Sequence, residues 1–202
     1  MALISNGATI FDNGSVTAGL GGSMNLMKKL TASGSSDLSF VQGTGGVDFT
    51  TYKEYVFMFN QIHAASDNVN FGFQANKTGQ SGYNQHTTGL GHRAYSNEGG
   101  DSGLGTANAG LAHSQNLMLL SEGTQRTGAD ESLSGFLHIY DPSNTTHFKC
   151  FKGQTMCQKG STYAIDCYVG GYHATTSAII GYQFKFHSDN IDTGSISLYG
   201  IS

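Results

Sequence analysis

The chain has 202 residues, of which 38% are hydrophobic, 11% aromatic and only 12% charged, and its formal net charge is −4. The ten Lys and Arg residues form no cluster, which argues against a phosphate-binding surface and so against nucleic acid as a partner. No stretch approaches the roughly 18 consecutive apolar residues of a membrane-spanning helix, so we expect no membrane insertion. The start, "MALISNGATIFDNG", lacks the basic and apolar regions of a secretory signal, so we expect none.

The composition favours β-structure. The polar residues are mainly Gly, Ser, Thr and Asn, and helix formers with charged side chains are scarce. A single domain of this length buries about 70% of the surface that its unfolded chain exposes, so it needs no disulfide or metal. The three cysteines fit no disulfide framework and predict free thiols, with Cys150 and Cys167 on apolar strand faces.

Residues 1–22 are small, polar and rich in Gly, and they predict an N-terminal arm before a single β-sandwich domain over residues 23–202. In that domain, "SMNLMKKLTAS" and "DLSFVQG" are separated by the turn signal "SGSS". We expect these two segments to form a hairpin.

The clearest early strand is "TYKEYVFMFNQIH", over residues 51–63. Tyr55, Phe57 and Phe59 line one face, and Val56 and Met58 line the other. Because both faces are apolar, we expect a central strand that is covered on each side. The alternating segment "NVNFGFQAN" follows a short turn, and we expect it to pair with this strand.

Residues 76–113 contain nine Gly and few aliphatic residues, and they predict a long Gly-rich connection with a weak edge strand near "HRAYS". This segment also presents aromatic and hydrogen-bonding groups, which suit contacts with sugars or with proteins. The candidate contact residues are Tyr83, His86, His92, Arg93 and Tyr95. The alternative is a loop that fills a groove or packs on a neighbouring subunit.

Short strand signals separated by polar turns continue to the end of the chain, and no helical period of useful length interrupts them. About eight to ten short strands are typical of an antiparallel β-sandwich or jelly roll. The last two signals, "YQFKFHS" and "GSISLYGI", alternate on either side of one polar turn. We expect them to form a hairpin-like pair that holds the C-terminus in a sheet.

No motif for catalysis or for a cofactor stands out. The eight His residues include no His-x-His pair that would suit a metal site on a strand, and no G-x-S-x-G elbow is present. The Gly clusters match no phosphate-binding pattern, and the acidic residues are scattered over turns. We therefore expect no enzyme activity, no metal and no cofactor.

Three stretches together resemble virion proteins of tailed phages, especially marine and cyanobacterial ones. They are "TYKEYVFMFNQIHAASDNVNFGFQ", "SGFLHIYDPSNTTHFKCF" and "YQFKFHSDNIDTGSISLYGI". In the last stretch, Asp189 stands where the family pattern more often has Gly. The resemblance covers most of the chain and is weakest over residues 76–113.

The resemblance implies a non-enzymatic structural protein of the virion, assembled in the host cytoplasm. The expected partners are phage capsid or tail proteins, with a homo-oligomer, a trimer being favoured. A capsid decoration or cement protein is the first expectation, and a tail-fibre or receptor-binding tip that recognises a host surface glycan is the alternative. The further alternatives are a carbohydrate-binding module, whether or not it belongs to a virion, and a hydrolase of host surface polysaccharide.

Overall fold

The computed structural model describes residues 3–5, 8–12, 15–16, 23–106, 117–121, 127–159 and 162–202. All regular secondary structure in these ranges is β-strand, and every pairing of strands is antiparallel. The prediction of an all-β, antiparallel β-sandwich is therefore confirmed.

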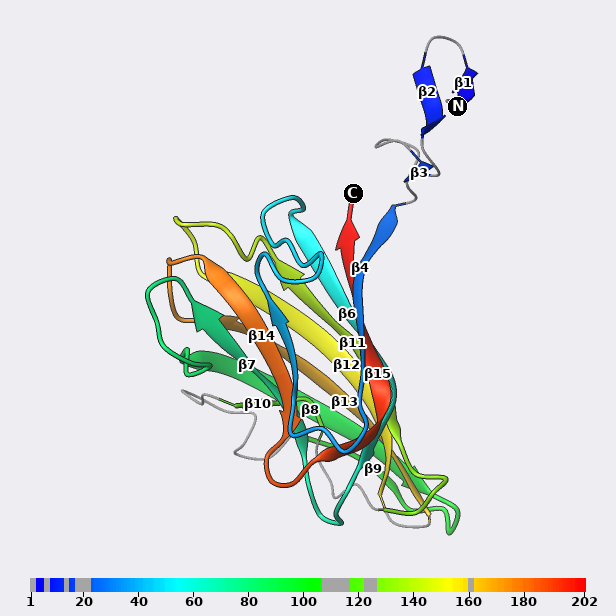
Figure 1. Ribbon diagram of the computed structural model, residues 1–202. Coiled ribbons are helices and arrows are strands. Elements are labelled where there is room, and N and C mark those ends of the chain that lie inside the picture. Colours follow the sequence, from blue (N-terminus) through cyan, green and yellow to red (C-terminus); the bar gives the residue numbers. More distant parts are fainter. Residues whose placement is uncertain are drawn as a thin grey trace.

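The larger sheet has eight strands in the order β4-β15-β6-β11-β12-β13-β8-β9 (Figure 1). Their bounds are Met24–Thr31 for β4, Glu54–Ala64 for β6, Thr87–Asn97 for β8, Ser102–Thr106 for β9, Leu133–Tyr140 for β11, Lys149–Lys159 for β12, Tyr163–His173 for β13 and Ile191–Ile201 for β15.

The smaller sheet has four strands in the order β10-β7-β14-β5. Their bounds are Leu38–Val41 for β5, Phe71–Lys77 for β7, Met118–Leu119 for β10 and Ile179–Phe186 for β14. The two sheets face each other, and the side chains between them form one core.

Aromatic rings fill much of this core. Phe57 of the larger sheet lies against Phe184 of the smaller sheet, with 4.8 Å between ring centroids, and against Tyr182 at 5.5 Å. Phe73 and Phe151 meet edge to face at 5.1 Å in the same way. Each such ring buries roughly 150–250 Å² of surface, so a chain without Trp still holds its two sheets firmly together.

Strands that follow each other in the sequence often lie in different sheets. β4 is in the larger sheet and β5 in the smaller, and the same holds for β6 and β7 and for β15 and β14. The three predicted hairpins, over residues 23–43, 51–76 and 182–201, are therefore wrong. Alternation shows which side chains a strand buries, but either sheet can receive a buried face, so the pattern left the pairing partner open.

The order of the other eight strands of the sandwich is simple once β8, β9, β12 and β13 are left out. The remaining sandwich strands, numbered one to eight along the chain, read 1-8-3-6 in the larger sheet and 2-7-4-5 in the smaller sheet. The four strands set aside extend the larger sheet beyond β11, so the insertions enlarge one sheet only.

The strand β6 is central, as predicted, because β15 and β11 pair with its two edges. Its inner face is buried, but Met58 on its outer face is 40% exposed. The expectation that β6 is covered on both faces is therefore wrong in the part of the chain that the structure describes. Val56 lies on the same outer face and is buried, and its cross-strand neighbour on β11 is His138.

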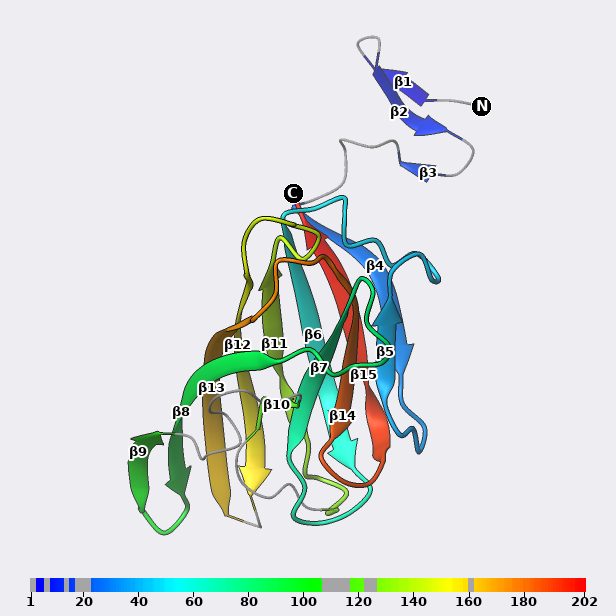
Figure 2. The ribbon, with the colours of Figure 1, turned by 90° about the vertical axis from the view of Figure 1, so that its left-hand side faces the viewer.

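The Gly-rich segment 76–113 contains more regular structure than the sequence suggested. The strand expected near "HRAYS" is β8, which has 11 residues and pairs with β13 on one side and β9 on the other. Figure 2 shows the β8-β9 hairpin at one side of the larger sheet. β9, and not β8, is the last strand of that sheet, and residues 107–113 lie outside the described ranges.

The segment expected as an N-terminal arm contains three short strands, Leu3–Ser5 (β1), Ala8–Asp12 (β2) and Ser15–Val16 (β3). They form a small sheet of their own in the order β1-β2-β3. Figures 1 and 2 both show this sheet apart from the sandwich, beyond the end at which β15 finishes.

Candidate functional site

The structure places the five predicted contact residues at four separate positions. Tyr83 lies in the loop between β7 and β8, where a Cβ built on Gly181 of β14 would come within 3.1 Å of its ring. His86 is exposed just before β8. Tyr83 thus packs on the smaller sheet, away from the three candidates on β8.

The three residues on β8 point to opposite faces because successive side chains of a strand alternate. His92 is exposed on the outer face of the larger sheet, and its ring stacks on Tyr168 of β13 at 4.9 Å and 12°. Arg93 and Tyr95 lie on the other face, where the Arg93 guanidinium sits 5.7 Å above the Tyr95 ring. These two residues line a hollow of about 290 Å³ together with Tyr163 and Ile165.

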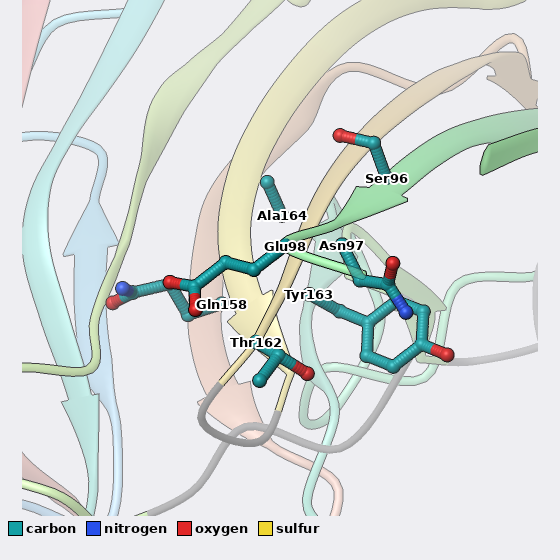
Figure 3. Close-up of a pocket in the computed structure, with 7 residues that line it drawn as sticks. All are labelled: Ser96, Asn97, Glu98, Gln158, Thr162, Tyr163 and Ala164. Atoms are coloured by element: carbon teal, nitrogen blue, oxygen red, sulfur yellow. The ribbon is translucent and has the colours of Figure 1, made fainter. Parts of the chain in front are cut away.

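Another hollow, of about 340 Å³, lies at the ends of β8, β12 and β13 (Figure 3). It is lined by Ser96, Asn97, Glu98, Gln158, Thr162, Tyr163 and Ala164. Glu98 is the one carboxylate in this lining, and neither His nor Cys accompanies it. The groups suit polar contacts, but they form no pair of acid and base or of nucleophile and base.

The outer faces of the two sheets differ in chemistry. In the described part of the chain, eight large hydrophobic side chains are exposed on the outer face of the larger sheet: Met24, Leu26, Met58, Leu90, Leu104, Tyr140, Met156 and Tyr172. Phe148 joins them by stacking on Tyr172 at 5.5 Å. These side chains are spread over seven strands, and a face with several exposed apolar groups is a candidate for an interaction surface.

The outer face of the smaller sheet is polar. Gln74, Gln183 and Ser39 lie in register on three neighbouring strands. The Gln183 side chain donates a hydrogen bond to the Ser39 hydroxyl at 3.1 Å. Val41 is the one large hydrophobic residue exposed on this sheet among the described residues. The larger sheet is therefore the better candidate for a binding surface.

At the middle of the larger sheet's outer face lies a hollow of about 240 Å³, which we call the aromatic hollow. It is lined by Phe136, His138 and Tyr140 of β11, Lys152, Gly153 and Gln154 of β12, and Tyr168 of β13. Three neighbouring strands thus contribute rings and polar side chains to one depression. His92 belongs to the rim, since its ring backs Tyr168.

The polar groups of the aromatic hollow are held in place. The Gln154 amide donates hydrogen bonds to both Asp166 oxygens at 3.0 Å and to the Tyr168 hydroxyl at 2.9 Å. The hydrogen bond and the negative charge of Asp166 also raise the pKa of the Tyr168 hydroxyl above its usual 10. On the other side, His138 Nδ1 contacts the Glu54 carboxylate, which sets the orientation of the imidazole.

Sequence reasoning missed most of this hollow. The stretch "SGFLHIY" does place Phe136, His138 and Tyr140 on one side of an alternation. Gln154 and Tyr168, however, come from other strands, and only the register of β11, β12 and β13 brings them beside Phe136. The alternation of residues within a single strand does not predict that register.

A buried polar pair lies on the inner face of the larger sheet. Lys149 and His173 are cross-strand neighbours on β12 and β13, and both are fully buried. The Lys149 ammonium donates a hydrogen bond to the Thr175 carbonyl at 3.2 Å, and the Thr87 hydroxyl lies 2.8 Å from His173 Nδ1. Burial, together with the nearby Lys149, lowers the pKa of His173 to about 3, so the ring is neutral near pH 7.

No disulfide joins the three cysteines. Cys157 and Cys167 are buried, whereas Cys150 is exposed on the outer face of the larger sheet, so the expectation of a covered position was wrong for Cys150. In the described ranges, no group of three or more His, Cys, Asp or Glu side chains could hold a metal ion. Those ranges also contain no helix long and apolar enough to cross a membrane.

Comparison of the chain with protein-family models, with curated proteins and with solved structures finds no match in any of the three.

Proposed function

We propose that this chain is a non-enzymatic structural protein of a tailed-phage particle, displayed on the capsid as a decoration or cement protein. The observation that carries the proposal is the strand order. We infer that the orders 1-8-3-6 and 2-7-4-5 make an eight-stranded jelly roll, to which β8-β9 and β12-β13 are added on one side. Jelly rolls of two packed sheets serve as viral capsid domains and as lectin domains.

The phage-like stretches support this proposal by where they lie. They cover β6 and the start of β7, β11 and the start of β12, and the end of β14 with β15. In the larger sheet, β15, β6, β11 and β12 are consecutive neighbours. The likeness therefore concerns the centre of the sandwich, which is the part that a shared architecture would preserve.

The proposed partners are capsid or tail proteins and further copies of this chain, with a trimer favoured. In this proposal the chain is assembled into virions in the host cytoplasm. The small β1-β3 sheet, which lies apart from the sandwich, is the proposed point of attachment. The outer face of the larger sheet would then remain available for recognition.

A second candidate is a tail-fibre or receptor-binding tip that recognises a host surface glycan. The observation that favours it is the aromatic hollow, which combines half-buried rings and the exposed Tyr140 ring with amide, ammonium and hydroxyl groups. Such combinations of an apolar face and polar tips suit sugars.

Mass spectrometry of purified particles from the phage that encodes this chain tests the proposal. We expect the chain in the particle, at hundreds of copies for capsid decoration and at few copies for a tail component. Deletion of residues 1–11 should leave the sandwich folded but reduce the number of copies per particle. Absence of the intact chain from purified virions would refute the proposal.

A further inference from the structure

We propose that the aromatic hollow binds one pyranose unit of a surface glycan. This inference rests on the proposed function, because a protein displayed on a particle meets the host surface. It assigns the binding site to the outer face of the larger sheet, and of the five contact residues predicted within residues 76–113 it keeps only His92. The site consists of Phe136, His138, Tyr140, Lys152, Gln154 and Tyr168, with His92 as a support behind Tyr168.

The rings provide the apolar part of the site. Phe136 and His138 meet edge to face at 5.3 Å and 90°, and His138 and Tyr140 are stacked at 6.3 Å and 19°. These three rings form one wall along β11, and Tyr168 stands opposite on β13. A sugar ring presents axial C–H groups on its faces, and such groups pack on aromatic rings in the way that other apolar groups do.

Tyr168 is held so that it offers one face to the hollow. His92 covers the other face of its ring, and the Gln154 amide fixes its hydroxyl. A ring that is fixed before the ligand arrives loses little rotational freedom on binding, which favours affinity. His92 is therefore a positioning residue that acts through Tyr168.

The polar groups provide the directional part of the site. The Gln154 amide nitrogen is engaged by Asp166 and Tyr168, and its carbonyl oxygen makes no hydrogen bond to the described residues. The exposed Lys152 ammonium likewise has no partner among those residues. One acceptor and one donor thus stand beside the rings, and a sugar hydroxyl can both donate and accept.

The size of the hollow sets the number of sugar units. Its volume of about 240 Å³ is below the roughly 300–1,000 Å³ of pockets that enclose drug-sized ligands. It therefore suits one unit of a longer glycan, whose other units would lie outside the hollow. A site this open is expected to bind weakly as a single copy and to gain avidity from many copies on a particle.

The experiment uses the isolated full-length chain on a printed array of bacterial surface glycans, followed by titration calorimetry with the oligosaccharide that gives the strongest signal. Tyr168→Ala should weaken binding at least tenfold, because it removes the stacking face. Tyr168→Phe keeps the ring and should stay within about threefold of the parent chain. Lys152→Gln, an exposed change that spares the fold, should weaken binding about threefold or more.

Tyr172→Ala is the matched control. Tyr172 lies on the same strand and the same face as Tyr168 but does not line the hollow, so its removal should leave affinity unchanged. His92→Ala should weaken binding less than Tyr168→Ala does. Thermal unfolding of each variant verifies that the sandwich is intact.

Three outcomes would overturn the inference. They are an array with no signal, equal losses for Tyr168→Ala and Tyr172→Ala, and a lower oligomer mass for Tyr168→Ala, which would identify the hollow as a contact between copies. Detection of the chain in virions is a separate measurement, so a failed glycan assay and a failed virion assay would be told apart.

Discussion

At the scale of single residues, Gly171 shows how closely three strands approach one another. A Cβ added there would lie 2.2 Å from the Thr88 carbonyl oxygen, 2.6 Å from the Gly89 Cα and 2.7 Å from the Phe151 ring. Two of these three atoms belong to the backbone and cannot move aside without shifting β8. Only a residue without a side chain fits where β8 and β13 meet above Phe151.

Gly171→Ala should therefore lower the free energy of unfolding by about 2 kcal/mol through overpacking. Gly105→Ala on β9 is the control, since its Cβ would meet nothing within 4 Å, and it should change stability by no more than about 0.5 kcal/mol. Urea unfolding of both variants measures the difference. Equal stability of the two would contradict the close approach of β8 and β13.

His173 is the other residue with a measurable signature. Its ring is enclosed by Phe73, Phe151 and Tyr182, and Lys149 is the cationic group nearby. Its Nε2 has no hydrogen-bond partner among the described residues. The folded chain therefore holds this imidazole in its neutral form.

The stability of the protein should fall as pH falls from about 6.5 toward 3. In that window the unfolded chain binds a proton on His173, whose ordinary pKa is 6.5, while the folded chain, with a pKa of about 3, does not. Between pH 7 and pH 4.5 this amounts to about 2–3 kcal/mol. Urea midpoints at the two pH values measure the loss.

His173→Phe should flatten this pH dependence, because the substituted side chain takes up no proton. His147→Gln, at an exposed position before β12, should leave the dependence as it is in the parent chain. If His173→Phe and the parent chain lose the same stability, another group accounts for the effect.

At the scale of elements, the connection between β5 and β6 is organised by one carboxylate. Asp48 accepts hydrogen bonds from the Gln42 amide at 2.9 Å, from the Thr50 N–H and hydroxyl at 2.9 and 2.7 Å, and from the Thr51 hydroxyl at 2.7 Å. These bonds, that of Gln42 first, hold the pKa of Asp48 well below its usual 3.8. The loop carries Phe49 into the core, where it meets Tyr55 and Tyr182.

Asp48→Ala should lower the free energy of unfolding by about 1–2 kcal/mol, since four donors lose their acceptor. The contribution is fully present above pH 3.8 and is lost as pH falls below it, because the folded carboxylate has the lower pKa. Lys53→Ala is the control. The Lys53–Asp141 ion pair is at the surface, with the Lys53 side chain 86% exposed, and should contribute less than about 0.5 kcal/mol.

Urea unfolding at pH 7 compares the two variants with the parent chain. A loss for Asp48→Ala no larger than that for Lys53→Ala would contradict the stabilising role of Asp48 in the loop.

At the scale of the whole molecule, the last strand completes the sandwich. β15 pairs with β4 on one edge and β6 on the other, and its Ile196 and Leu198 are fully buried. The C-terminus thus lies inside a sheet, as expected. Its neighbours are nevertheless strands from the first third of the chain, and not the strand that precedes it.

Deletion of Ser195–Ser202 should abolish cooperative folding and leave the protein insoluble. The strand β4 would lose its pairing partner, and the core would lose the buried side chains of Ile196 and Leu198. Deletion of residues 1–11, of similar size, should leave a cooperative unfolding transition and a soluble product. Circular dichroism and urea unfolding provide the readout. A soluble, cooperatively folding product of the first deletion would refute the central role of β15.

The sequence by itself determined the class of fold and the position of most strands. The alternation of apolar residues such as Tyr55, Phe57 and Phe59 predicts which side chains are buried, and that pattern is local to each strand. Gly-rich, weakly apolar stretches carry less of this signal. For this reason β8 was expected as a short edge strand and not as 11 residues paired on both sides.

Only the tertiary structure decided which strands are neighbours and which side chains meet. A strand with one buried face can pair within a hairpin or cross to the opposite sheet, because both bury the same surface; here β4, β6 and β14 cross to the opposite sheet before the next strand begins. The same choice of neighbours assembled Phe136, Gln154 and Tyr168 from three strands. The alternation within one strand predicts which of its residues are buried, whereas the register between strands depends on the packing of the whole sandwich.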